Sequence, residues 1–457
     1  MTQAKRLGGG KHDVDMTVGS TVRHLILFSL PLLAGNVFQQ LYNLVDTWTV
    51  GNFVSNEAFS AVGSVTPIIN MLIGAFIGLS SGAGVVISQF YGAHDDEKVH
   101  DAVHTAMLMT LILGVVLTVL GELFIPLSLR MMDTPPEVVP ESTAYLRIYF
   151  GGLMGLLIYN MGSGILRAVG DSKRPFYYLV VCAVVNIFLD LLFVLQFHMG
   201  VGGVAWATII AQAVSAVLVV IELLRYDASI KLKIGDLKIN PPMLGKIVKI
   251  GIPAALQMAI TAFSNIFVMG YINFFGADCM SGWTAYNKID MLMFLPMQSI
   301  ALASTTFVGQ NLGSGQAERA KRGSRIALFL AMGITAVLLV PVMLFAPQLT
   351  AFFNSKPEVV EYGTMLLRYI SPFYLLTCIN QVYSGALRGA GDSTAPMIIM
   401  LGSFVLFRQC YLYVMAHFIS NTVLPIAMSY PAGWLVCSII TLVYYRHTSF
   451  TKHRVVS

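Results

Sequence analysis

Long apolar stretches alternate with short polar segments along almost the whole chain. Each stretch reaches the length of about 20 residues that a helix needs to cross a bilayer. Strands of a membrane barrel would alternate apolar and polar residues, whereas these stretches are continuous. Because lipid admits only helices and closed barrels, the pattern predicts transmembrane helices. We place twelve of them, at 23–50, 60–90, 102–124, 143–166, 176–197, 202–224, 247–274, 282–309, 326–346, 361–387, 397–418 and 423–445.

Several of the polar segments between these stretches occur twice. The sequence LRAVGDSKRP at 166–175 returns as LRGAGDSTAP at 387–396, an offset of 221 residues. QFYG at 89–92 and QNLG at 310–313 have the same offset. Membrane transporters are often built from such repeats, and their substrate sites lie where the repeats meet.

The repeat predicts an all-α polytopic membrane protein with two six-helix lobes. We assign residues 1–224 to the N-terminal lobe, 225–246 to a cytoplasmic linker loop and 247–457 to the C-terminal lobe. Each lobe has an even number of helices, so both lobes enter the membrane from the same side. We therefore expect pseudo-two-fold symmetry about an axis along the membrane normal, with a central cavity.

Composition supports this class, and the distribution of charge adds an orientation. Charged residues make up 11% of the chain, whereas a soluble domain has about a quarter. The loops on the side of the N-terminus carry 22 of the 28 Lys and Arg residues, which predicts that both termini are cytoplasmic. We expect a multi-pass monomer in the inner (plasma) membrane. The net charge of +5 is then a topology signal, and no nucleic-acid partner is expected.

A few polar side chains fall inside the predicted spans. A carboxylate at a helix centre costs about 2.5–3.5 kcal/mol on insertion scales, and such residues usually face a cavity. Asp46 lies in the first span, while Asn186 and Asp190 share one face of the fifth. Thr208 begins the sixth span from the same outer side. Together they predict an all-oxygen site for a proton or a hard cation such as Na⁺. The alternative is that both carboxylates only bond neighbouring helices.

The second half does not repeat these acids. Asp46 aligns with Val268 and Asp190 with Tyr411, although Pro31 does align with Pro253. The scaffold is therefore shared while the acids are not, and we expect ion coupling in the first lobe.

Two charged residues in the second half each have more than one interpretation. Asp290 is a candidate coupling or substrate acid, or a partner of Lys288. For Arg408 there are three alternatives: an ion pair with an acid across the cavity, capping of backbone carbonyls, or a structural role. We favour the structural role.

A group of histidines and acids follows the second span. His94, Asp95, Asp96, His100 and His104 include one pair at i,i+4 spacing. The group lies where a cytoplasmic loop enters a helix and does not recur in the second half, so we favour a solvated loop over a metal site. No P-loop, GxSxG or HExxH motif occurs, and neither a resident cofactor nor ATP-driven chemistry is expected.

Taken together, the chain resembles the multidrug and toxic compound extrusion (MATE) family over its full length. The resemblance rests on the twelve spans, the paired Gly-Asp-Ser…Pro loops, GQNLG at 309–313 and LYNLVD at 41–46. It implies an antiporter that exports amphipathic, often cationic, small molecules in exchange for H⁺ or Na⁺. A NorM-like branch carries an acid in the first helix of its second lobe. Here 247–274 contains none, so the chain is more similar to the DinF-like branch.

The same resemblance implies residues that line a first-lobe cavity. These are Gln39, Tyr42 and Asn160, to which we add Asn43, Asp290 and Arg408 as candidates for cargo contacts. A lipid-linked oligosaccharide flippase of the same superfamily shape is the alternative. It needs basic residues to hold a diphosphate, but acids outnumber bases in these spans. An intramembrane enzyme would need a nucleophile–base or metal constellation on facing helices, and the sequence shows none.

Overall fold

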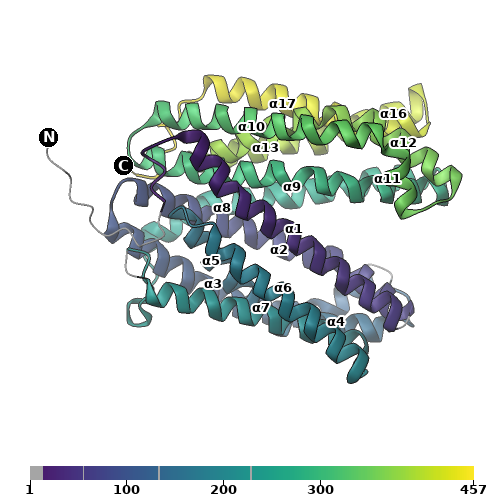
Figure 1. Cartoon of the computed structure of the whole chain (residues 1–457), viewed down its shortest axis with the longest axis horizontal. Helices are drawn as coiled ribbons and strands as arrows, with labels where there is room; N and C mark the ends of the chain where they lie inside the picture. The colour runs from purple at the N-terminus through teal and green to yellow at the C-terminus, as the bar shows by residue number, and fades with distance from the viewer. Residues whose placement is uncertain (1–13, 55, 132–133, 227–228, 457) are drawn as a thin grey trace. The chain divides into compact units, whose positions relative to one another are not determined.

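A computed structural model describes residues 14–54, 56–131, 134–226 and 229–456, and the regular elements among them are helices (Figure 1). The first half contains α1 (Thr21–Phe53), α2 (Asn56–Gly92), α3 (Asp96–Met131), α4 (Val139–Gly151), α5 (Leu153–Ala168), α6 (Lys173–Leu191), the π-helical η1 (Leu192–Gln196) and α7 (Gly200–Arg225).

The second half begins with a short 3₁₀ turn in the linker and repeats the same order. Its elements are η2 (Ile234–Asp236), α8 (Pro241–Asn273), α9 (Ala277–Gly313), α10 (Ala317–Leu344), α11 (Ala346–Phe353), α12 (Pro357–Ile370), η3 (Ser371–Phe373), α13 (Tyr374–Gly389), α14 (Thr394–Met400), η4 (Leu401–Phe407), α15 (Arg408–Val414), η5 (Met415–Ile419), α16 (Val423–Ala427) and α17 (Ser429–His447).

The twelve predicted spans all coincide with helices or helix pairs, which confirms the predicted fold class. Ten helices in the described chain are long and apolar enough to cross a membrane, and α4 with α5, bent by 47°, makes an eleventh. The tenth predicted span, 361–387, is divided between α12 and α13 by the turn η3. Gly152, which separates α4 from α5, aligns with this turn in the repeat.

The contacts divide the described chain into two compact units. The first comprises residues 14–15 and 30–251, and the second comprises Met16–Ser29 and the chain from Ile252 onward. The division therefore falls inside α1 and α8, two residues before Pro31 and Pro253, rather than in the linker. Each of these helices begins in one unit and ends in the other.

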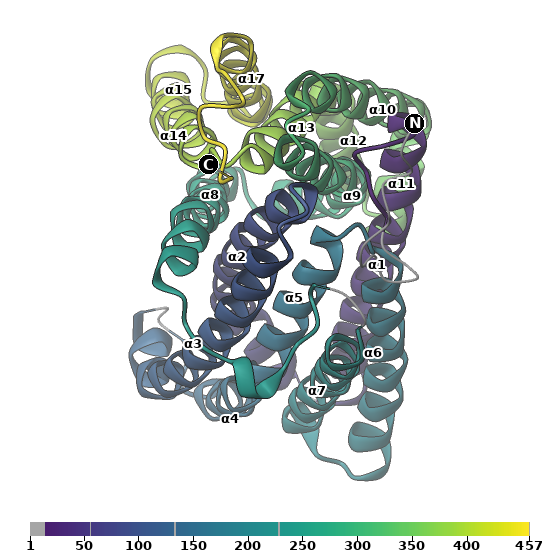
Figure 2. The same ribbon diagram turned by 90° about the vertical axis from the view of Figure 1, so that its left-hand side faces the viewer.

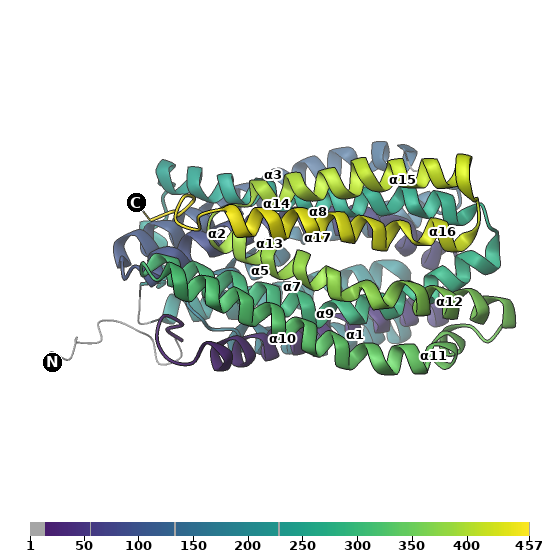
Figure 3. The same cartoon turned by 90° about the horizontal axis from the view of Figure 1, so that it is seen from above.

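Helix packing within the two units follows one pattern. In the first unit α5 packs on α2, α3 and α7 (Figure 2). In the second, α13 packs in the same way on α9, α10 and α17, and α17 also lies beside α15 (Figure 3). Glycine permits the close approach at equivalent positions, because a Cβ on Gly164 would lie 2.6 Å from Ser80 Oγ and one on Gly385 would lie 2.6 Å from the Ala301 carbonyl.

The repeated Gly-Asp-Ser loops have the same backbone geometry in both units. Gly170 has φ +89° and Gly391 has φ +96°, a left-handed conformation that glycine adopts without strain. The Asp171 carboxylate then accepts hydrogen bonds from the amides of Lys173 (3.1 Å) and Arg174 (3.2 Å) at the start of α6. Asp392 accepts one from Ala395 (3.0 Å) at the start of α14. The duplicated sequence therefore makes a duplicated helix start.

Candidate functional site

A partly buried carboxylate, a buried carboxylate and a buried amide meet between α1 and α6 in the first unit. Asn186 and Asp190 lie one turn apart on α6 and are 1% and 0% exposed. The carboxylate of Asp46, on α1, faces both side chains. Directly after Asp190 the helix loosens into the π-helical turn η1, a distortion frequent at functional sites. The structure thus brings together three of the four residues predicted for the ion site.

Most polar side-chain atoms of this group lack a hydrogen-bond partner among the described residues. Asp46 Oδ1, both oxygens of Asp190 and both amide atoms of Asn186 are buried and form no hydrogen bond of ordinary geometry to a described residue. The ion pairs found among the described residues do not include these carboxylates. A buried polar group without a partner is unfavourable. The donor set, with carboxylate and amide oxygens, fits a proton or a hard cation.

The fourth predicted ligand has a different partner. The Thr208 hydroxyl donates to the Val204 carbonyl of its own helix (2.9 Å), and the described contacts show no bond from it to the carboxylates. Its place in the ion site therefore stays a prediction.

Two tyrosines that sequence reasoning missed surround the pair. Tyr145 and Tyr149 lie on α4, both 7% exposed, and their phenols lie near Asp46. Their rings are stacked, with centroids 6.2 Å apart. The i,i+4 spacing of two tyrosines inside an apolar span was the available signal, but it does not show which helix they face.

The predicted cavity residues of the first unit have varied surroundings. Tyr42 is buried in a cluster with Tyr159, Leu179, Ala183 and Ala216, and its hydroxyl bonds to the Gln39 side chain. Asn160 is partly buried, and its amide donates to the Leu156 carbonyl (2.8 Å). Asn43 is exposed on α1. Tyr42 also lies near Asp46, so it connects this group to the ion site.

In the second unit the described hydrogen bond to Asp290 comes from a tyrosine rather than from a base. The Tyr286 hydroxyl donates to Asp290 Oδ1 (3.0 Å), and Tyr374 of α13 lies near this carboxylate. None of the described ion pairs joins Asp290 to Lys288. The carboxylate therefore has a neutral donor, unlike the carboxylate oxygens of Asp190.

Arg408 is buried among neutral partners of the same unit. Its guanidinium donates to Ser264 Oγ and to Asn265 Oδ1 (2.9 Å), and lies over the Tyr430 ring, 4.6 Å from its centroid. Asn265 is the repeat equivalent of Asn43. These contacts hold α8, α15 and α17 together.

Comparison with known proteins accounts for this architecture. The MatE family model matches residues 31–192 and 253–414, so each matched segment begins at one of the two aligned prolines. The chain is 30% identical over 437 residues to "Probable multidrug resistance protein YoeA" of Bacillus subtilis, covering 93% of this chain and 94% of that protein. It is 26% identical to "Probable multidrug resistance protein NorM" of Thermotoga maritima, covering 95% and 94%.

A solved structure described as the outward-facing conformation of a multidrug resistance MATE family transporter of the MOP superfamily has the same fold. Its TM-score is 0.90 at 25% identity, covering 96% of this chain and 98% of that one. With the family model matching most of the chain and the fold shared throughout, the chain belongs to the MATE family of multidrug efflux transporters.

Proposed function

We propose that this protein is a secondary antiporter, which exports amphipathic organic cations and is driven by H⁺ or Na⁺ moving inward through the Asp46–Asp190 pair. The observation that carries the proposal is the pair itself, in which Asp46 Oδ1 and both oxygens of Asp190 are buried without a hydrogen-bond partner among the described residues. Two anionic carboxylates that face each other away from water repel strongly. The pair is therefore stable when it holds a proton or a cation.

Antiport follows because the cationic cargo and the coupling ion compete for the negative charge of the Asp46–Asp190 pair. A cationic cargo in the first-unit cavity is favoured when the pair is anionic and disfavoured when an ion occupies it. Gln39, Tyr42, Asn43 and Asn160 are the proposed cargo contacts there, and Asp290 is a separate candidate cargo contact in the second unit. The tyrosines around the pair offer aromatic faces to a cation.

The presence of two carboxylates is relevant to the driving force. One charge crossing 100 mV is worth about 2.3 kcal/mol. Exchange of one inward proton for one outward monovalent cation cancels this contribution and leaves only the ion gradient. Binding of two inward charges at Asp46 and Asp190 would restore it.

The test is uptake of ethidium into inside-out membrane vesicles, under an imposed pH gradient and separately under a sodium gradient. We expect uptake under one of the two gradients, with a loss of at least tenfold in Asp46→Asn and Asp190→Asn. The matched control is Asp278→Asn, which removes a carboxylate that pairs with Lys356 at an exposed position (2.6 Å), and should transport normally.

The outcomes separate the parts of the proposal. Uptake that survives both Asp46→Asn and Asp190→Asn would contradict the site. No uptake under either gradient would favour the flippase alternative, which needs a basic cavity. Thr208→Ala tests the fourth predicted ligand, since an unchanged dependence on the coupling ion would remove it from the site.

A further inference from the structure

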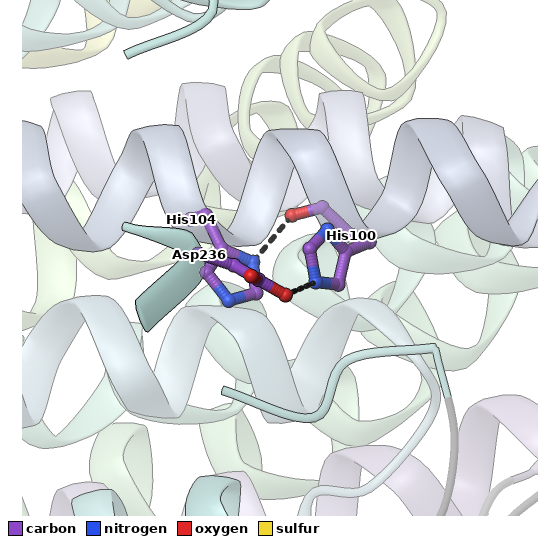
Figure 4. Close-up of side chains that lie close together, drawn as sticks. All are labelled: His100, His104 and Asp236. Carbon is purple, nitrogen blue, oxygen red and sulfur yellow. Dashed lines mark hydrogen bonds and ion pairs between the residues drawn. The ribbon is translucent and has the colours of Figure 1, made fainter. Parts of the chain in front are cut away.

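A second group of titratable side chains lies near the start of α3 and in the linker, and it does not include the Asp46–Asp190 pair. His100 and His104 are one turn apart near the start of α3, and Asp236 approaches them from η2 in the linker (Figure 4). His100 Nε2 lies 3.3 Å from Asp236 Oδ2. One ligand atom from each of the three residues lies within 4.8 Å of the other two.

The ring of His104 is oriented as in many metal sites. Its Nδ1 lies 2.7 Å from the His100 carbonyl, so Nδ1 carries the proton and Nε2 presents its lone pair. Metal-binding histidines commonly donate their other N–H to a backbone carbonyl in this way. At present Nε2 accepts the Lys233 amide (3.0 Å), so the linker occupies the ligand position.

The two other members are accessible from solvent. The side chains of His100 and Asp236 are 28% and 46% exposed, while His104 is fully buried. Lys233 Nζ lies 3.8 Å from Asp236 Oδ2, but this side chain is 60% exposed and is free to move away. A cation from solvent can therefore reach two ligands directly and the third by displacing one amide.

We propose that His100, His104 and Asp236 bind one divalent transition-metal ion of the zinc type, which replaces the Lys233 amide at His104 Nε2. Two imidazole nitrogens and one carboxylate oxygen suit zinc, with water in the fourth position. Mg²⁺ and Ca²⁺ prefer oxygen ligands, so the histidines disfavour them. Zinc–ligand distances of about 2.0–2.2 Å require the ligand atoms to approach by roughly 1 Å.

Such an ion would tie the linker to α3 within the first unit. The linker is already anchored next to the cluster, because Asn240 donates to Asp101 Oδ2 (2.8 Å) and to Thr105 Oγ1 (3.0 Å). This anchorage holds η2 near the histidines before any ion binds. The sequence favoured a solvated loop because the group lies where a loop enters a helix and does not recur in the second half. The approach of Asp236 to His100 does not follow from spacing, because Asp236 is distant in the chain.

Only two of the five residues grouped in the sequence, His100 and His104, belong to this cluster. Asp95 accepts the Lys98 amide (3.1 Å) and pairs with Lys98 Nζ (3.0 Å), so it caps the start of α3. His94 lies in the preceding turn and outside the three-residue cluster. His94→Asn is therefore a matched control, since asparagine tolerates the left-handed φ of +55° found at this position.

The experiment is a Zn²⁺ titration of the purified full-length protein, carrying no polyhistidine tag, in competition with a chromogenic chelator. We expect one Zn²⁺ per chain. His100→Ala and Asp236→Asn should weaken binding by at least about tenfold, whereas His94→Asn should bind like the unmodified protein. Excess Mg²⁺ should not compete.

Gel filtration of each variant distinguishes lost ligands from lost folding. The visible spectrum of bound Co²⁺ gives a second readout, which should change in His100→Ala and remain in His94→Asn. Zn²⁺ affinity that is equal in all variants, or no stoichiometric binding by the unmodified protein, would overturn the site. The cluster shares no residue with the Asp46–Asp190 pair, so either result leaves the proposed antiport to its own test.

Discussion

Two glycines at equivalent positions of the repeat allow the left-handed backbone conformation of the Gly-Asp-Ser loops. A Cβ on Gly170 would lie 2.3 Å from the Val14 carbonyl, and one on Gly391 would lie 2.3 Å from the His453 carbonyl. Both have positive φ, which costs an L-residue about 1–2 kcal/mol. The backbone at Val14 therefore packs against Gly170, and the backbone at His453 packs against Gly391, so closely that neither glycine position has room for a side chain.

We expect Gly170→Ala and Gly391→Ala to lower the thermal unfolding midpoint of the detergent-solubilised protein. Both changes combine backbone strain with a collision against a carbonyl. The control is Gly315→Ala, where φ is +80° but no atom lies within 4 Å of the added Cβ. It should lose only the strain contribution of about 1 kcal/mol. A midpoint for Gly170→Ala equal to that of Gly315→Ala would contradict the packing argument.

At the residue scale, the sequence predicts what depends on spacing along one helix. The sequence predicts that Asn186 and Asp190 share one face of a helix, and both lie on the buried side of α6. The partners missed there, Tyr145 and Tyr149, approach from another helix. The same limit applies to Asp236, which reaches His100 through the linker. Such contacts depend on tertiary packing, and the periodic pattern of a single helix does not predict them.

Among elements, equivalent glycines permit close approach where α5 crosses α2 and where α13 crosses α9. The equivalent glycines there have different neighbours. A Cβ on Gly385 meets the Ala301 backbone carbonyl at 2.6 Å, while a Cβ on Gly164 meets the Ser80 hydroxyl at the same distance. A hydroxyl can rotate away, but a helix carbonyl moves only with its helix. The repeat therefore offers a matched pair of crossings.

We predict that Gly385→Ala destabilises the protein by more than Gly164→Ala, because only the first forces two helices apart. Gly333→Ala on α10 has open space around the new Cβ and should be neutral or stabilising by up to about 1 kcal/mol, since alanine favours helix. Thermal midpoints and protease resistance of the three variants measure the order. Equal losses in Gly164→Ala and Gly385→Ala would show that the crossings are equally adaptable.

The predicted elements agree with the structure in position and order but not in internal detail. Apolar length alone located each span, because lipid imposes that length. The bend at Gly152 and the turn at Ser371–Phe373 were not predicted. The π-helical segments η1, η4 and η5 were missed as well. Hydrophobicity does not change at these positions, since both sides of each break remain in an apolar environment.

On the scale of the whole molecule, the two described ends of the chain have equivalent positions in their units. Val14 donates its amide to the Val169 carbonyl (3.3 Å) beside the first Gly-Asp-Ser loop. Arg454 donates to the Gly313 carbonyl (2.7 Å), and His453 pairs with Asp392 of the second loop (3.7 Å). These loops belong to the basic side of the sequence. The positive-inside rule then predicts that both ends are cytoplasmic.

Cysteine labelling of intact cells tests this orientation. Ser355 lies between α11 and α12, Ser449 follows α17, and both are exposed. With Cys410, which is exposed, replaced by serine, the remaining four cysteines are buried. A membrane-impermeant maleimide should label Ser355→Cys in intact cells, and Ser449→Cys only after the cells are opened. The reverse order would invert the topology and with it the direction of ion flow proposed for Asp46 and Asp190. Labelling of both in intact cells would show that loop charge does not fix one orientation.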